Sequence, residues 1–192
     1  MDEITNPSPQ PLEFEGFPKL FRLSRECVIT EKLDGTNAQV YISPEGEIIA
    51  GSRTRWIYPG NDNYGFAAWV EANKQELLKL GPGRHFGEWW GSGIQRGYGL
   101  TKGEKRFSLF NTSIWGSPEV RPKCCDVVPV IYQGMFSTQV VEECLEKLRK
   151  EGSLAVPGFM KPEGVVIFHT AGGWLAKKTC EKDESPKSLV EK

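Results

Sequence analysis

The segment that decides the fold reads Glu31-Lys32-Leu33-Asp34-Gly35-Thr36-Asn37. An extended apolar run, 27–30, leads into it. A second segment, 36–42, leads out of it and alternates apolar with polar residues, which is typical of a half-buried strand. The turn at 44–46 then predicts a returning strand over 47–50. The sequence thus places Lys32 at the end of one strand, directly before a tight turn and a hairpin.

A lysine in this position can be a nucleophile. Lysine attacks phosphorus only as the neutral amine, and its ordinary pKa is about 10.4, so burial or nearby positive charge must lower that value. A strand end followed by a Gly turn can hold the side chain rigidly at a pocket. The alternative is a strand-end lysine before an Asp-Gly hairpin turn, which is a common structural feature. The segment alone leaves both interpretations open.

The rest of the chain alternates short strands with two helices. Helices are expected over 64–80, after the capping residues Asn61 to Asn63, and from Ser137 or Thr138 to just before Gly152. The remaining expected strands are 85–90, 107–110, 127–132, 164–169 and 174–179. These elements predict the α+β class, with antiparallel sheets flanked by helices. The expected domains are an extended arm (1–17), one folded domain (18–183) and a flexible charged tail (184–192).

Composition narrows the function classes. The chain has 192 residues, a net charge of −1 and five cysteines, of which Cys124 and Cys125 are adjacent. This pattern suits neither a disulfide scaffold nor a zinc site, and the charge gives no general basic footprint for nucleic acid. No apolar run approaches the roughly 20 residues of a membrane span, and the start does not read as a secretory signal. We therefore expect a cytoplasmic protein without membrane contact.

Five further segments carry residues suited to nucleotide chemistry. In chain order they are Ser52-Arg53-Thr54, His85-Phe86-Gly87-Glu88-Trp89-Trp90-Gly91, Phe107-Ser108-Leu109-Phe110, Glu163-Gly164-Val165-Val166 and Trp174-Leu175-Ala176-Lys177-Lys178-Thr179. Together with the lysine segment, they resemble in order the motifs of the covalent nucleotidyltransferase superfamily: DNA ligases, RNA ligases and mRNA capping enzymes. The resemblance extends from about residue 18 to 183. It implies a nucleotidyltransferase (ATP-grasp-like ligase) domain, with ATP and Mg²⁺ or Mn²⁺ as cofactors.

The resemblance also implies a role for each motif residue. Lys32 would attack ATP, and Arg53 would reach the phosphates or the RNA end. Glu88 would hold the ribose hydroxyls, and Phe107, the first aromatic of its strand, would stack on the adenine. Glu163 would serve the metal and the phosphates, since Mg²⁺ prefers oxygen ligands. Taken singly, each has a plainer alternative, such as a surface acid for Glu88 or a core side chain for Phe107.

The last segment departs from the family pattern. The family has two lysines separated by one residue, whereas Lys177 and Lys178 are adjacent and must point to opposite faces of a strand. We expect Lys177 to face the pocket and neutralise the α-phosphate, with Thr179 in the second position. Lys178 remains the alternative catalytic lysine.

Two residues favour the RNA ligase branch within this superfamily. Asn37 completes the spacing Lys-x-x-Gly-x-Asn of that branch, where the asparagine lies near the α-phosphate, and Glu31 corresponds to a residue at the nucleotide base. We also expect no OB-type domain of the kind that DNA ligases and capping enzymes carry, since only a few mostly polar residues follow the last motif. The Gly-rich loop 92–99 offers Arg96 as a bidentate donor and Tyr98 as a stacking surface for RNA or nucleotide phosphates. An ordinary surface loop is the alternative.

The expected function is an ATP-dependent RNA ligase in RNA repair. It would form lysyl-AMP, pass AMP to a 5′-phosphate end and catalyse attack by a 3′-hydroxyl. The expected partner is RNA with those ends, and a separate protein chain is an alternative further partner. Two alternatives remain open: a DNA ligase or other nucleotidyltransferase acting with a partner chain, and a catalytically inactive module that binds nucleic-acid ends.

Overall fold

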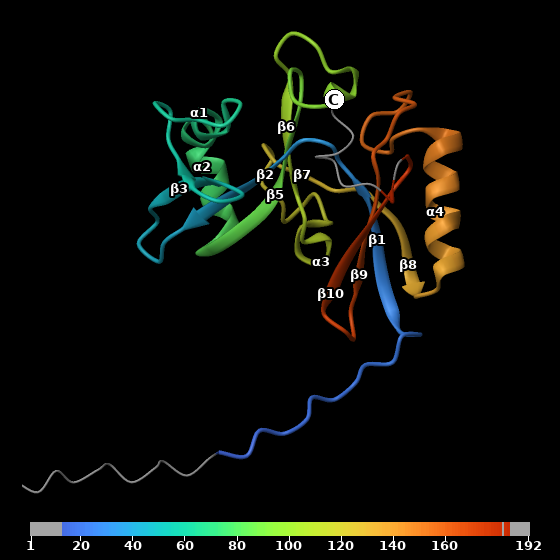
Figure 1. The fold of residues 1–192 in the computed structure, drawn as a ribbon. Helices are drawn as coiled ribbons and strands as arrows, with labels where there is room; N and C mark the ends of the chain where they lie inside the picture. The colour runs from blue at the N-terminus through green and yellow to red at the C-terminus, as the bar shows by residue number, and fades with distance from the viewer. Residues whose placement is uncertain (1–12, 182, 185–192) are drawn as a thin grey trace, which may run out of the picture.

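The computed structural model describes residues 13–181, 183 and 184, which form two β-sheets with helices on their outer faces (Figure 1). Sheet A has the order β10-β9-β1-β8 and consists of β1 (Glu26–Lys32), β8 (Val130–Met135), β9 (Gly164–His169) and β10 (Trp174–Thr179). Sheet B has the order β4-β3-β2-β5-β6-β7 and consists of β2 (Thr36–Ile42), β3 (Ile48–Ser52), β4 (Trp56–Ile57), β5 (Gly83–Gly91), β6 (Lys105–Leu109) and β7 (Asp126–Val127). The expected α+β class is confirmed. The expectation of purely antiparallel sheets is wrong at one pair, because β6 and β7 run parallel.

The two sheets are joined directly by the lysine segment. β1 ends at Lys32 in sheet A, and β2 begins at Thr36 in sheet B, so only three residues cross between them (Figure 1). This crossing places Lys32 at the junction of the sheets. A separate small core lies at the same junction and consists of Leu33, Trp90, Tyr98 and Val128.

Sheet B is covered on one face by two short helices and a 3₁₀ turn, α1 (Phe66–Ala72), α2 (Lys74–Leu77) and η1 (Leu78–Leu80). The single helix expected over 64–80 is therefore broken. The break falls at Asn73, whose side-chain amide donates to the Trp69 carbonyl at 2.8 Å while its own φ of −110° leaves the helical range. Asparagine side chains compete in this way with backbone hydrogen bonds.

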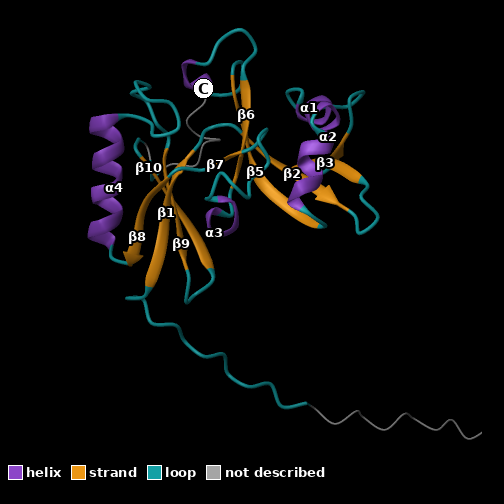
Figure 2. Cartoon of the chain, turned by 180° about the vertical axis from the view of Figure 1, so that it is seen from behind, coloured by secondary structure: helices purple, strands orange, loops and turns teal. Residues whose placement is uncertain are grey.

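Sheet A packs against α4 (Thr138–Glu151), which lies along its outer face (Figure 2). The Ser137 hydroxyl accepts a hydrogen bond from the Val140 amide and caps the helix, and Gly152 ends it with a φ of 84°. The helix expected here is confirmed at both ends. Its buried stripe meets the inner residues of β1 and β9 in a core of Cys27, Ile29, Val141, Cys144, Leu145, Leu148, Val165 and Ile167.

Several small elements were not expected from the sequence. They are β4, α3 (Thr112–Trp115) and the 3₁₀ turn η2 (Gly97–Gly99). The strand expected over 127–132 is two strands, β7 and β8, separated at Val128 and Pro129. Proline has no amide hydrogen to continue a ladder, which accounts for the interruption.

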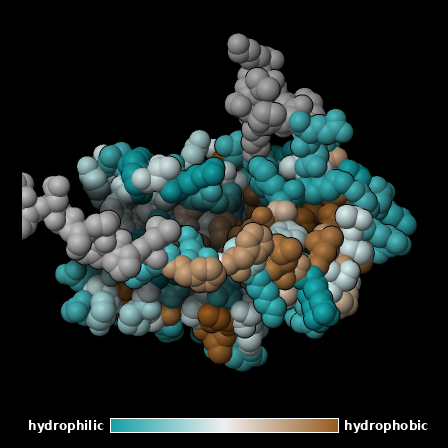
Figure 3. Space-filling model, turned by 60° about the horizontal axis from the view of Figure 1, so that its bottom comes forward, coloured by the Kyte–Doolittle hydropathy of each residue, from teal (hydrophilic) through white to brown (hydrophobic). Residues whose placement is uncertain are grey.

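The two ends of the chain lie largely outside the described residues, namely 1–12 of the expected arm and 185–192 of the expected tail. From residue 13 to β1 the chain has no regular structure and leads away from sheet A (Figure 1). Apolar side chains gather near the middle of the face seen from below, among hydrophilic ones (Figure 3). Within the described ranges, no helix has the length and apolar character that crossing a membrane requires.

Candidate active site

The candidate site forms around the end of β1. Strand alternation turns Cys27 and Ile29 toward α4 and Lys32 toward the opposite face of sheet A. There the Lys32 Nζ lies 2.5 Å from the Glu163 Oε2. The lysine side chain is 21% exposed, and the glutamate is 2% exposed. The structure thus brings together two residues that are 131 positions apart in the sequence.

Backbone pairing explains this contact. β1 and β9 are antiparallel neighbours, and Lys32 pairs with Gly164, the residue after Glu163. The end of β1 therefore meets the beginning of β9. A buried carboxylate is costly unless it is paired and hydrogen-bonded, and the lysine amine provides that pairing here.

Glu88 occupies the sheet B side of the site. In β5 it pairs with Asn37 of β2, and its carboxylate accepts hydrogen bonds from the Gly35 amide and from the Asn37 Nδ2, both at 3.0 Å. Burial raises the pKa of the Glu88 carboxyl from 4.5 to about 7, although the charge of Lys32 opposes the rise. The negative charge of Glu163 adds to it. Lys32, Glu163 and Glu88 therefore act on one another as a single charge cluster.

The two adjacent lysines of β10 point to opposite faces of sheet A, as expected. Lys177 pairs with Val166, which in turn pairs with Thr30, so it shares the face of Lys32. Lys178 turns toward α4 and forms an ion pair with Glu142. The geometry gives Lys177, and not Lys178, access to the side of the sheet that carries Lys32.

Phe107 is not available for stacking. Its ring is fully buried beneath α1, with the Phe66 centroid at 5.0 Å and the Trp69 centroid at 5.7 Å. The prediction that it stacks on adenine is therefore wrong, because no face of the ring is free. The core alternative for this residue is confirmed.

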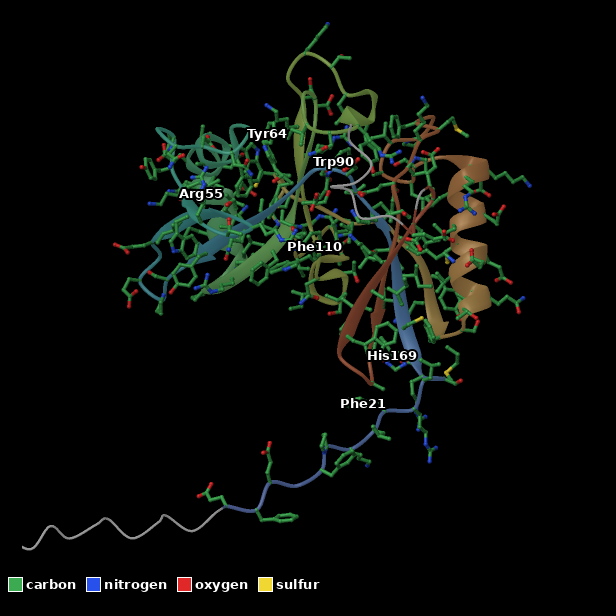
Figure 4. All side chains as sticks on the ribbon, in the orientation of Figure 1. Phe21, Arg55, Tyr64, Trp90, Phe110 and His169 are labelled. Atoms are coloured by element: carbon green, nitrogen blue, oxygen red, sulfur yellow. The ribbon has the colours of Figure 1, made fainter. Side chains whose placement is uncertain are left out.

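Phe110 offers the exposed ring that the site lacks at Phe107. Ser108 pairs with Glu88 across β5 and β6, so strand alternation carries the face of Glu88 to Ser108 and on to Phe110 just past the strand end. Phe110 is 42% exposed and lies near the centre of the molecule in Figure 4. Sequence reasoning missed it by taking the first aromatic of this segment.

The predicted RNA contacts in loop 92–99 have other partners. Tyr98 is fully buried, so the prediction that it provides a stacking surface is wrong. The Arg96 Nε donates to the Asp34 Oδ2 at 3.0 Å, and its Nη1 donates to the Lys161 carbonyl at 3.1 Å. This guanidinium is thus engaged within the protein, which counts against the predicted contact with RNA.

The remaining predicted residues lie at different depths. Asn37 and Arg53 are exposed, with Arg53 in the turn directly after β3. Glu31 is 1% exposed, and its Oε2 accepts hydrogen bonds from the Leu154 and Ala155 amides. Burial raises its pKa, and its Oε1 is buried with no hydrogen-bond partner among the residues that the structure describes.

The sequence profile of the RNA ligase family matches residues 25–179, which is most of the chain. No curated protein sequence gives a significant match.

Solved structures of Naegleria gruberi RNA ligase share the fold. One variant with ATP and Mn aligns with a TM-score of 0.61 at 20% identity, covering 83% of this chain and 51% of that chain. Another variant with ATP and Mn gives 0.57 at 18% identity over 83% and 51%. A variant with AMP and Mn gives 0.57 at 18% over 82% and 50%. The chain spans about half the length of these structures.

The matched range begins just before β1 and ends at the last residue of β10. It therefore contains both sheets and every residue of the charge cluster around Lys32. The resemblance that the ordered motifs indicate is confirmed over this range, and the chain belongs to the RNA ligase family.

Proposed function

We propose that this protein joins RNA ends by ATP-dependent ligation through a lysyl-AMP intermediate. The observation that carries the proposal is the charge cluster, in which Lys32 at a strand end meets Glu163 and its charge acts on the Glu88 carboxyl. These three residues suit a nucleophile, a phosphate-side carboxylate and a ribose-binding carboxylate. Residues 18–183 would form the adenylylation domain.

In the first step the Lys32 Nζ attacks the α-phosphorus of ATP. An N–P bond forms, the P–O bond to pyrophosphate breaks, and the amine loses its proton. Because Lys32 is held by Glu163 at rest, that ion pair must loosen before the amine can attack. Lys177, on the same face of the sheet, would neutralise charge on the α-phosphate as the transition state forms.

Glu88 and Phe110 would hold the nucleoside. The Glu88 carboxylate can accept hydrogen bonds from the ribose hydroxyls, and the exposed face of Phe110 can stack on the adenine. Asn37, beside Glu88, would reach the α-phosphate, and Glu31 would contact the base through its Oε1, which has no partner within the described part of the chain.

Glu163 is the residue suited to a divalent metal. Mg²⁺ is commonly bound through one or two carboxylates together with substrate phosphates, so a single glutamate beside the α-phosphate fits Mg²⁺ or Mn²⁺. When bound there, the metal would supply positive charge to the phosphates.

The later steps use the RNA ends. A 5′-phosphate oxygen attacks the phosphorus of lysyl-AMP, the N–P bond breaks, and a 5′-5′ pyrophosphate forms. A 3′-hydroxyl then attacks the 5′-phosphate, loses its proton and releases AMP. Exposed Arg53 is the proposed contact to the phosphates of the RNA end.

The test is adduct formation followed by sealing. Intact-mass measurement after incubation with ATP and Mg²⁺ should show one added AMP. Lys32→Ala should abolish it, and it should also lower the unfolding temperature because the buried Glu163 carboxylate loses its cation, so adduct formation is measured well below that temperature. An adduct that persists in Lys32→Ala would overturn the assignment of the nucleophile. RNA and DNA 3′-hydroxyl ends, each single-stranded and nicked, should then be offered; sealing of DNA nicks alone would move the protein to a DNA ligase function.

A further inference from the structure

The Gly-rich loop after β5, residues 92–99, is hydrogen-bonded to the backbone of the nucleophile and of the turn that follows it. The Tyr98 hydroxyl accepts a hydrogen bond from the Asp34 amide at 3.0 Å and lies 3.4 Å from the Lys32 carbonyl, to which it donates. The bonded groups belong to the nucleophile itself and to the residue two positions later. Burial raises the pKa of the tyrosine, so the hydroxyl keeps the proton that it donates.

The tyrosine ring is fixed as firmly as its hydroxyl. It is fully buried, with the Phe159 centroid at 4.6 Å and the Trp90 centroid at 5.1 Å in an edge-on contact; Trp90 is labelled in Figure 4. Its φ of 51° lies in the left-handed region that non-glycine residues rarely adopt. Gln95 of the same loop also has a positive φ, of 45°. Such backbone strain persists where surrounding contacts determine the conformation, and it concentrates at functional sites.

Arg96 connects the same loop to the segment that carries Glu163, the other partner of the ion pair. Its guanidinium bridges the Asp34 carboxylate and the Lys161 carbonyl. Asp34 is two residues after Lys32, and Lys161 is two residues before Glu163. The loop therefore fixes the segments that carry the nucleophilic amine and the carboxylate that holds it.

We propose that Tyr98 and Arg96 are positioning residues for Lys32, and that loop 92–99 sets the geometry between Lys32 and Glu163. This inference rests on the proposed function, since it assigns the loop to the attack on ATP. The loop acts through the backbone and does not touch the nucleotide. An in-line attack needs the amine within a narrow range of positions, and a displacement of about 1 Å can cost two orders of magnitude in rate.

The chain contains a matched control for each residue. The Tyr132 hydroxyl donates to the Met135 carbonyl in β8, away from the nucleophile. Arg149 bridges the Glu146 carboxylate and the Cys180 carbonyl. Like Arg96, it therefore joins one carboxylate and one backbone carbonyl. Tyr132→Phe and Arg149→Lys thus remove interactions of the same kind from other parts of the fold.

The experiment compares Tyr98→Phe and Arg96→Lys with these two controls. The single-turnover rate of lysyl-AMP formation at saturating ATP should fall at least about tenfold in both loop variants, with the half-saturating ATP concentration changed by less than about twofold. Both controls should keep the wild-type rate. A loss of thermal stability with an unchanged rate, measured well below the unfolding temperature, would show a merely structural role and overturn the proposal.

A second readout works without ATP. Acetylation of Lys32 by an N-hydroxysuccinimide ester, quantified by peptide mass, should be faster in the loop variants because the ion pair with Glu163 is held less firmly. It should be unchanged in the controls. Failure of the wild type to form lysyl-AMP would refute the proposed function alone, and equal acetylation in all five proteins would then refute the positioning role.

Discussion

The two sheets contribute different chemistry to the site. Sheet A brings Lys32 and Lys177 to one face, where the Lys32 Nζ lies 2.5 Å from the Glu163 Oε2. Sheet B offers Glu88, whose carboxylate is met by two neutral donors and whose pKa burial raises to about 7. Sheet A thus supplies the charged groups of the reaction, and sheet B supplies the groups that would hold the nucleoside. Substitutions in sheet A should therefore change reaction rates, whereas those in sheet B should change nucleotide affinity and the pH dependence of stability.

The largest effect should come from the two lysines of β10. Lys177→Ala should slow lysyl-AMP formation about 100- to 1000-fold, as loss of a group that stabilises transition-state charge does. Lys178→Ala should leave the rate within about twofold, because its ion pair with Glu142 is exposed and on the other face of the sheet. Single-turnover labelling of both variants tests the contrast; equal small losses would refute the assignment of Lys177.

The next effect concerns the pH dependence of stability at Glu88. Its pKa is higher in the folded protein than the ordinary 4.5, so the folded state binds more protons between pH 4.5 and 7. Its contribution to stability is therefore full below about pH 4.5 and is lost as the pH rises through 7. Glu88→Gln, which stays neutral, should be more stable than the wild type at pH 8 by no more than about 3 kcal/mol.

Thermal unfolding of both proteins at pH 5 and pH 8 measures this difference. The advantage of Glu88→Gln should shrink at pH 5, where the wild-type carboxyl is largely protonated. A constant difference at both pH values would show that the carboxyl is ionised throughout.

A smaller effect should distinguish the two phenylalanines of the β6 segment. Phe107→Leu should lower the free energy of unfolding by about 1 to 2 kcal/mol, because the ring is buried in the sheet B core. Phe110→Leu should cost little stability and instead weaken ATP binding several-fold, as loss of a stacking face does. Urea unfolding and ATP titration of both variants give the comparison. The reverse pattern would return Phe107 to the nucleotide site.

The smallest effect should appear in the salt dependence of RNA end binding. If Arg53 contacts one phosphate, Arg53→Ala should reduce the slope of log affinity against log salt by about one unit. Arg149→Ala, a change on α4 far from β3 in the chain, should leave the slope unchanged. Titrations of a non-ligatable RNA at several salt concentrations provide the slopes.

The sequence predicted the elements with strong local signals. The bounds of β2, β9 and β10 were predicted to the residue, because alternation and flanking turn residues mark them. The opposite faces of Lys177 and Lys178 also follow from strand geometry alone, whereas Lys32 is singled out only by the ordered resemblance of all six motifs. The short β4 and α3 carry too few residues for a periodic signal.

The errors at the site, at Phe107 and Tyr98, share one physical cause, which is dependence on contacts distant in sequence. Phe107 and Phe110 are both aromatic, and only the pairing of Ser108 with Glu88 shows which side chains of β6 lie on the same face of sheet B as Glu88. Tyr98 was expected to be exposed because it lies in a Gly-rich loop. Its burial depends on Phe159 and on the backbone at Asp34, neither of which is near it in the chain.

Gly35 and Gly164, which belong to the motifs, lie where neighbouring backbone leaves no room for a side chain. A Cβ at Gly35 would lie 2.4 Å from the Trp89 carbonyl oxygen, and one at Gly164 would lie 2.2 Å from the Lys178 carbonyl oxygen. Neither residue touches a reacting atom, yet any side chain there would push apart backbones that carry the charge cluster. A mutational scan scored only by ligation would count both as catalytic, whereas a scan scored by protein abundance would assign them to the fold.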